Sequence, residues 1–357
     1  MPWQPNSVNS FITPIFMVWK YTGLLIFTSK YCHKLKKNIF VSGNCQILPV
    51  TTVVIPTVCA YFVSTRIVLN YTQTILAIQF FFIGLMNAIT LCFLYSRRKQ
   101  IVDVVTKFSE AEERISKLTK NRITYKYGDL LLKYVVLRYV FAVVACTSDV
   151  VSEPIFKAAT FCYHFFWNYQ FHLQLVVIVL FLVLKSLYAK VEDHVKQNGF
   201  SYSFETVREI IQELDSLIAD IQKTFQEIIL VETGLEILCT TVGLYYTALT
   251  IPTWEFAFSV SGIFYLFLQA VADFSTICFY QFVAEQRKRL VEKVADIYGT
   301  KTGTYFQKTV YRTTRHFSEL QFVVSGFFSL DYPTIYSMIA GMSTMVVYLF
   351  QFRKKEI

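Results

Sequence analysis

The last apolar stretch of the chain, LDYPTIYSMIAGMSTMVVYLFQF (residues 330–352), decides the fold class. It is long enough to cross a bilayer, because about 20 helical residues span roughly 30 Å of hydrocarbon. Asp331 suits an N-cap, and Pro333 falls in the first turn, where its missing N–H is no loss. We therefore predict a membrane-spanning helix that begins afresh at this point.

One face of this predicted helix carries small and polar side chains. Spacings of four, three, four and three residues place them in a single stripe, which consists of Ser337, Gly341, Thr344, Tyr348 and Gln351. In lipid, such a stripe serves either close helix packing or the lining of a water-filled path. The second use requires several copies of the chain around an axis, because one helix cannot enclose a path. Both uses are open from these residues alone.

The composition indicates that the helix belongs to a polytopic membrane protein. Of the 357 residues 54% are hydrophobic, and 34 are Phe and 23 are Tyr, which is unlike a soluble domain. Apolar runs of spanning length lie at 47–67, 73–95, 129–150, 160–186, 228–250, 256–281 and 333–352. The chain is thus predicted to be all-α, with seven transmembrane helices. A shorter run, 11–27, has Lys20 in its middle and is expected to lie at the membrane interface; the alternative is that it spans.

The distribution of cations gives the predicted orientation. If the N-terminus is cytoplasmic, the inside connections hold 26 Lys and Arg residues, while the opposite loops hold Arg66 and Lys157. Positive charge prefers the cytoplasmic side, so we predict a cytoplasmic N-terminus and an extracellular C-terminus. The formal charge of +9 therefore reflects topology, and no nucleic-acid partner is expected. The glycosylation sequon at Asn70 falls in an outside loop very close to the membrane.

Cytoplasmic connections show helical periodicity. Apolar residues recur in two stripes, Ile101, Val104, Val105, Phe108, Ile115, Leu118 and Phe204, Val207, Ile211, Leu214, Ile218, Ile221, Phe225, Ile228. Residues 305–324 show a similar stripe that ends at Val324. We predict that spans continue as long helices into a cytoplasmic anchor bundle, where they pack on each other or on other subunits. The alternative is that these helices lie on the inner leaflet.

No enzyme motif is present in the sequence. It lacks the nucleophile elbow, the zinc-protease motif, the P-loop and the dinucleotide fingerprint, so neither an enzyme nor a cofactor or metal site is expected. The eight cysteines include no CxxC pair. Cys146 and Cys162 flank one predicted outside loop, and a disulfide between them is open.

Aromatic and polar residues gather at the outer ends of three predicted spans. They include His164, Trp167, Gln170, Tyr245, Tyr246 and Trp254. An aromatic cavity with a few convergent polar groups is the usual make-up of a small-molecule site. Trp and Tyr are also enriched at membrane interfaces in general, so interfacial anchoring is the alternative.

Three charged residues fall inside predicted spans. Lys133 and Arg138 lie in the inner part of one span and Asp273 lies in another. Charges within a membrane are costly and suggest function. The alternatives are inner headgroup contacts for the two cations and a structural hydrogen bond for Asp273.

The C-terminal residues carry a family resemblance. The stretch SGFFSLDYPTIYSMIAGMSTMVVYLFQF (325–352) resembles the C-terminal signature of insect gustatory receptors, in which Thr-Tyr is followed by five hydrophobic residues and Gln-Phe. Thr344, Gln351 and Phe352 match this signature, and Met345 stands in place of its tyrosine. Val346 stands where the sugar-receptor branch has Glu, which favours a bitter-type or uncharacterised receptor.

The resemblance implies a tetrameric, ligand-gated, non-selective cation channel in the plasma membrane of sensory neurons, opened by a small organic tastant. It implies a pore lined by the last helix, with Gln351 and Phe352 near the outer constriction, and a ligand pocket in the outer half of the preceding helices. The domains would then be the N-terminus, the ligand-binding bundle, the anchor segment and the pore helix with its tail, at 1–46, 47–281, 282–330 and 331–357. A G-protein-coupled seven-helix receptor is the first alternative, and a transporter is the second.

Overall fold

The computed structural model describes residues 7–13, 27–32, 37–42, 92–120, 127–152, 157–198, 204–250, 256–299 and 321–353, together with 5, 85, 89, 90, 123 and 125. Six long helices make up most of this part of the chain. They are α4 (Arg98–Thr119), α5 (Gly128–Ser152), α6 (Lys157–Asn198), α7 (Phe204–Thr250), α8 (Phe256–Gly299) and α10 (Tyr332–Arg353). Two short antiparallel hairpins accompany them, β1 (Phe27–Cys32) with β2 (Lys37–Ser42), and β3 (Val323–Val324) with β4 (Phe328–Ser329).

Five of the predicted spans coincide with helices. The runs 129–150, 160–186, 228–250, 256–281 and 333–352 fall in α5, α6, α7, α8 and α10. The run 47–67 lies outside the described residues, as does most of 73–95, of which 92–95 are helical. By length and composition, three described helical stretches can cross a membrane: Gln174–Gln197, Phe204–Tyr245 and Tyr332–Gln351.

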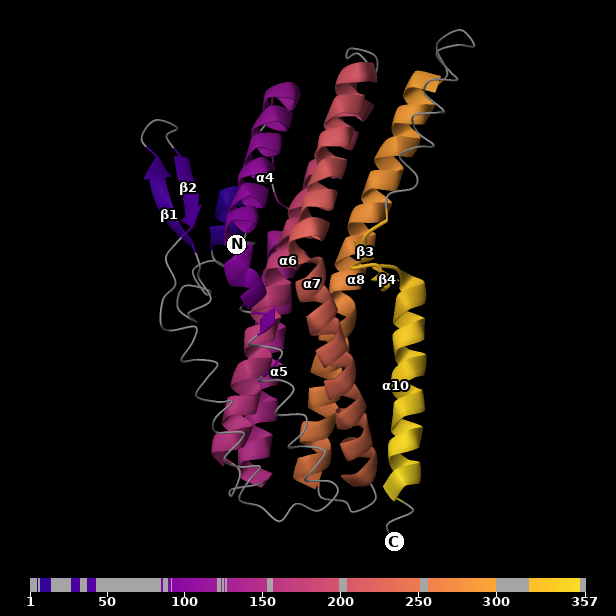
Figure 1. Ribbon diagram of the computed structural model, residues 1–357. Coiled ribbons are helices and arrows are strands. Elements are labelled where there is room, and N and C mark those ends of the chain that lie inside the picture. The colour runs from indigo at the N-terminus through magenta and orange to yellow at the C-terminus, as the bar shows by residue number, and fades with distance from the viewer. Residues whose placement is uncertain are drawn as a thin grey trace.

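Three helices continue well beyond their spans, as predicted. In Figure 1, α6, α7 and α8 run the full height of the molecule, while α5 and α10 accompany only their lower halves and α4 only their upper halves. We call the upper half the anchor and the lower half the span region. The N-terminal residues lie beside α4 in the upper half, and the C-terminus lies at the lower end.

Helices α4 and α7 pack against each other in the anchor through their predicted stripes. Every member of the α7 stripe is buried, and so is every member of the α4 stripe except Leu118, which packs partly buried against the core. Ion pairs run along the edge of this contact: Arg97–Glu227 (2.6 Å), Lys107–Asp220 (2.6 Å) and Arg114–Glu213 (2.8 Å). Because the numbers rise on α4 and fall on α7, the two helices are antiparallel. Exposed pairs of this kind contribute little stability, so the buried apolar stripe holds the helices together.

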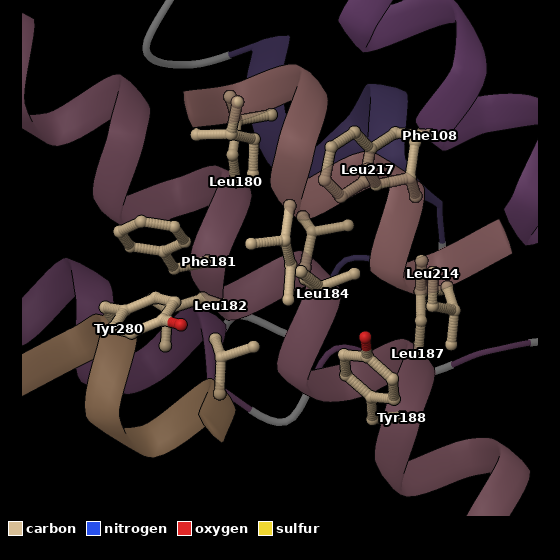
Figure 2. Close-up of a cluster of buried hydrophobic side chains, with 14 of the residues drawn as sticks. Phe108, Leu180, Phe181, Leu182, Leu184, Leu187, Tyr188, Leu214, Leu217 and Tyr280 are labelled. Carbon is tan, nitrogen blue, oxygen red and sulfur yellow. The ribbon is translucent and has the colours of Figure 1, made fainter. Parts of the chain in front are cut away.

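The hydrophobic core of the described part is built along α6. Its residues from Leu175 to Leu184 are all at most 3% exposed, because α6 has neighbours on every side in α4, α5, α7 and α8. Figure 2 shows Phe181 of α6 beside Tyr280 of α8, and Leu217 of α7 beside Phe108 of α4. A helix that is apolar all round is expected where the whole helix is buried.

One buried ion pair ties the anchor helices together. The Arg287 guanidinium of α8 donates two hydrogen bonds to the Asp215 carboxylate of α7, at 2.7 and 2.9 Å, and the Tyr188 hydroxyl of α6 donates to the same carboxylate at 2.6 Å. Tyr188 is fully buried and Arg287 is 7% exposed. A buried charged group is stable only when an opposite charge and hydrogen bonds replace its contacts with water.

Residues 7–13 pack on α4. Val8, Phe11 and Ile12 are buried, and the Phe11 ring stacks on Tyr125 at 5.4 Å between centroids. Glu112 of α4 accepts hydrogen bonds from the Val8 amide at 2.9 Å and from the Tyr125 hydroxyl at 3.0 Å. Burial, and then the neighbouring Glu112 carboxylate, raise the pKa of Tyr125 well above its usual value, so the hydroxyl stays a donor.

Two features of the described fold differ from the predictions. The hairpins were not predicted, and Val324, taken as the end of a helical stripe, lies in β3 instead. Strands of two residues have no periodicity to detect, and the segment makes extended pairs with β4. The rest of that stripe, 305–320, lies outside the described residues, as do 14–26 of the predicted interfacial run and the Asn70 sequon.

Candidate functional site

A short hairpin precedes the start of α10. The segment 321–331, here called the strap, leads into α10 through β3, a turn and β4. Both central residues of the turn have positive φ, 48° at Ser325 and 78° at Gly326. This is the pattern of a type I′ turn, which glycine adopts without strain. The turn presents Phe327, which is 77% exposed.

The predicted N-cap of α10 is confirmed. Asp331 Oδ1 accepts hydrogen bonds from the Thr334 amide at 2.9 Å and from the Thr334 hydroxyl at 2.7 Å, and Ser329 donates to Oδ2. Burial opposes ionisation of Asp331, but these hydrogen bonds outweigh it and lower its pKa. A carboxylate at this position satisfies amide groups that have no partner within the helix.

The strap is held to the bundle at several points. Phe322 is fully buried, with its ring 5.8 Å from Phe181 and 5.4 Å from Tyr280. Gln222 of α7 donates to the Val323 carbonyl at 2.8 Å, and Gln281 of α8 donates to the Leu330 carbonyl at 2.5 Å. The capped end of α10 is thus connected to α6, α7 and α8.

Helix α10 itself is mostly uncovered. Among the described elements its principal contacts are with α7 and α8, and its buried residues in the described part are Met338 and Met342. Only 11% of its apolar stretch is buried, against 83% for the stretch in α6. From 343 to 351 no described residue is fully buried, although Val346 and Leu349 are half-buried.

The predicted polar stripe lies on the uncovered side of α10. Ser337, Gly341, Thr344, Tyr348 and Gln351 are all exposed, whereas Met338 and Met342, on another side of the helix, are buried against α7 and α8. The Ser337 and Thr344 hydroxyls donate to carbonyls one turn back, at 3.1 and 2.9 Å. Phe352 belongs to the helix, but its side chain is outside the described part. Packing against the described part of this subunit therefore does not account for the stripe.

One predicted ligand residue touches α10. Tyr245 of α7 is fully buried, and its ring lies 5.2 Å from that of Phe350, near the C-terminal end of α10. His164, Trp167 and Gln170 lie on α6 and Tyr246 lies on α7, but their side chains are outside the described part; Trp254 lies wholly outside it. Of the predicted pocket residues, Tyr245 is therefore the one with a described side chain, and it contacts the last helix.

A buried polar cluster lies between the helices of the span region. Gln174 of α6 donates to Glu236 of α7, and both are at most 5% exposed. Tyr134 of α5 lies beside Ser275 of α8 and near Glu236 and the buried Arg138. Arg138 is thus placed inside the bundle, among polar groups from four helices.

A second carboxyl group lies one turn from this cluster. Glu232 of α7 is 3% exposed, and no described residue donates a hydrogen bond to its Oε1. Glu232 and Glu236 were not predicted as functional residues, although two acidic residues four apart inside an apolar run are a visible signal. Gln222 and Gln281 were not predicted either, and they carry no such signal.

The remaining charged residues and cysteines singled out from the sequence add no further member to this cluster in the described part. Lys133 is exposed and pairs with Asp129 one turn back at 2.8 Å. The side chains of Asp273, Cys146 and Cys162 are outside the described part. Within the residues that the structure describes, no group of three His, Cys, Asp or Glu side chains could hold a metal ion.

Comparison with known proteins agrees with this architecture. The model of the 7tm chemosensory receptor family matches residues 12–356. The olfactory receptor OR5 of the insect Machilis hrabei in complex with eugenol has the same fold, with a TM-score of 0.71 and 11% identity over 97% of this chain and 98% of that one. OR5 solved without that ligand gives a TM-score of 0.69 with the same identity and coverage. No curated protein sequence matches the chain. With nearly its whole length matched and the receptor fold present, the chain belongs to the family of 7tm chemosensory receptors.

Proposed function

We propose that this receptor is a ligand-gated, non-selective cation channel, in which several copies of α10 surround a pore and a small organic tastant opens it. The observation that carries the proposal is the polar stripe of α10, which is exposed in the single chain. An exposed polar stripe in lipid is unfavourable unless other helices or water cover it. Four subunits around an axis, in a homo- or heterotetramer of gustatory receptor subunits, would supply that cover.

The proposed pore is lined by Ser337, Gly341, Thr344, Tyr348, Gln351 and Phe352. Apart from Phe352, these residues are small or carry neutral polar groups, which suits a path that admits hydrated cations without binding one tightly. Gln351 lies in the last turn of α10, farthest from the capped inner end. It is therefore the residue that we assign to the outer constriction.

The proposed tastant site lies among His164, Trp167, Gln170, Tyr245, Tyr246 and Trp254, in the outer half of the span region. The fold shared with OR5, which was solved in complex with eugenol, supports a small organic compound. The contact of Tyr245 with Phe350 supports a route from this site to α10. The absence of Glu at position 346 favours a bitter-type ligand over a sugar.

The proposed orientation places the anchor in the cytoplasm of a sensory neuron and the C-terminus outside the plasma membrane. Residues 7–13 lie in the same half as the helix extensions, and the C-terminus lies at the opposite end (Figure 1). The family match does not favour a G-protein-coupled receptor. A tag before residue 7 should stay inaccessible in intact cells and become accessible after permeabilisation; labelling in intact cells would overturn the orientation.

Permeation tests the pore directly. We expect Gln351→Ala to change the relative permeability to cations, or block by large cations, because it removes a polar group from the constriction. Ile339→Ala is the matched control, since Ile339 is exposed on a different face of the same helix. Currents should be recorded in excised patches without GTP, during application of a panel of bitter compounds and sugars. Equal effects of the two substitutions, or a current that requires GTP, would contradict the proposal.

A further inference from the structure

The inner and outer ends of α10 are held very differently. At the inner end, Leu330 is 1% exposed, Asp331 caps the helix, and Met338 and Met342 are buried. Towards the outer end, the main described ring contact is the one between Tyr245 and Phe350. A helix fixed at one end and loosely covered along the rest can tilt about the fixed end.

The strap supplies the fixation at the inner end. Its β3–β4 pairing is closed by the hydrogen bond from the Leu330 amide to the Phe322 carbonyl, at 2.9 Å. Phe322 is fully buried between Phe181 and Tyr280, so the start of the strap is anchored by apolar contacts. These bonds make the strap one rigid piece, but they do not by themselves attach its far end to the bundle.

Two glutamines make that attachment. The Gln222 amide binds the Val323 carbonyl where the strap begins, and the Gln281 amide binds the Leu330 carbonyl just before the cap. They come from two different helices, α7 and α8, so the strap bridges both. The next residue after Leu330 is Asp331, whose carboxylate holds the first turn of α10. The two glutamine hydrogen bonds, the backbone of the strap and the Asp331 cap together connect α7 and α8 with the pore helix.

We propose that Gln222 and Gln281 are positioning residues that fix the inner end of α10, so that the helix opens and closes the pore by tilting about the strap. The proposal rests on the channel function proposed above. The glutamines act through backbone carbonyls of the strap and do not line the pore. Their loss should therefore alter how readily the channel opens and leave its ion selectivity unchanged.

Methionine substitutions test this assignment. Gln222→Met and Gln281→Met keep the side-chain volume but remove the donor. Gln212→Met is the control, because Gln212 is exposed on the same helix as Gln222. In excised patches we expect each of the two test variants to shift the balance of open and closed states about fivefold, the effect of one lost hydrogen bond. The reversal potential should stay that of the parent. Unchanged opening, or a changed reversal potential, would overturn the proposal.

A chemical readout separates this proposal from the channel function. Cys278 is a free, half-buried thiol one turn before Gln281, and it lies close to Tyr332 in the first turn of α10. Loosening the inner end of α10 should uncover this thiol. We expect N-ethylmaleimide to label Cys278 about fivefold faster in the two test variants than in the parent and in Gln212→Met. The full chain in lipid nanodiscs and site-resolved mass spectrometry suffice for this measurement, even if the parent passes no current. Equal labelling in all four proteins would overturn the assignment.

Discussion

At the scale of single residues, buried polar groups distinguish this receptor from a simple apolar bundle. The Asp215–Arg287 pair is complete, with three short hydrogen bonds to one carboxylate. Glu232 is the opposite case, because no described residue donates to its Oε1. Both carboxyl groups are on α7. Because Asp215 is fully hydrogen-bonded and Glu232 is not, substitutions at these two positions should have opposite effects on stability.

Breaking the complete pair should be costly. Arg287→Met leaves the Asp215 carboxylate buried without its cation, and such losses typically cost about 3–5 kcal/mol of folding free energy. The double change Asp215→Leu with Arg287→Met removes both charges and should recover much of that loss. Thermal unfolding of the purified receptor would measure both effects. A double variant as unstable as Arg287→Met would contradict this account.

Replacing Glu232 by a neutral residue should not destabilise the receptor. Glu232→Met removes a buried carboxyl group that lacks a donor, so we expect the unfolding temperature to stay level or rise. Ligand-evoked current should be recorded alongside, because acidic residues within a membrane are often retained for function. A stable variant with reduced current would assign Glu232 a functional part. A large drop in unfolding temperature would show that the group has a structural partner.

At the scale of elements, the cap of α10 makes one helix sensitive to acid. The Asp331 carboxylate binds the first turn only when it is ionised, and its pKa in the folded protein is lowered. A lowered pKa means that the stabilisation is fully present above the ordinary Asp value of about 3.9 and is lost as the pH falls through the lower folded value. The cap is therefore intact at neutral pH.

Replacing the cap should have a pH-dependent cost. At pH 7 we expect Asp331→Ala to destabilise the receptor by about 1 kcal/mol, and Asp331→Asn by less, because Asn also caps helices. As the pH is lowered below the ordinary Asp value of about 3.9, the difference between parent and Asp331→Ala should shrink once the parent cap becomes protonated. Unfolding temperatures of the three proteins, measured at pH 7 and along this acid series, test the prediction. A difference that grows in acid would refute the assigned role.

At the scale of the whole molecule, the periodic segments were predictable and the irregular ones were not. The stripes of α4 and α7 were readable because burial on one side of a helix repeats every three or four residues. The strap was not, since hydrogen bonds from Gln222 and Gln281 to backbone carbonyls follow no repeat. The stripe of α10 was found by its spacing, but its exposure became evident only when Met338 and Met342 were seen to face α7 and α8. The tastant site remains a prediction, and Tyr245 is the one of its residues whose side chain the structure describes.

The packing of residues 7–13 on α4 has a consequence for the order of events during synthesis. The Val8 amide binds Glu112, which lies 104 positions later in the chain. The ribosome makes this segment long before its binding surface exists, so Val8, Phe11 and Ile12 must wait with their apolar side chains uncovered until α4 and Tyr125 have emerged. The segment can therefore dock only after α4 has been made, which follows the two predicted spans at 47–67 and 73–95. Bulky additions close to Val8 are expected to hinder that step more than equally bulky additions at the opposite end of the chain.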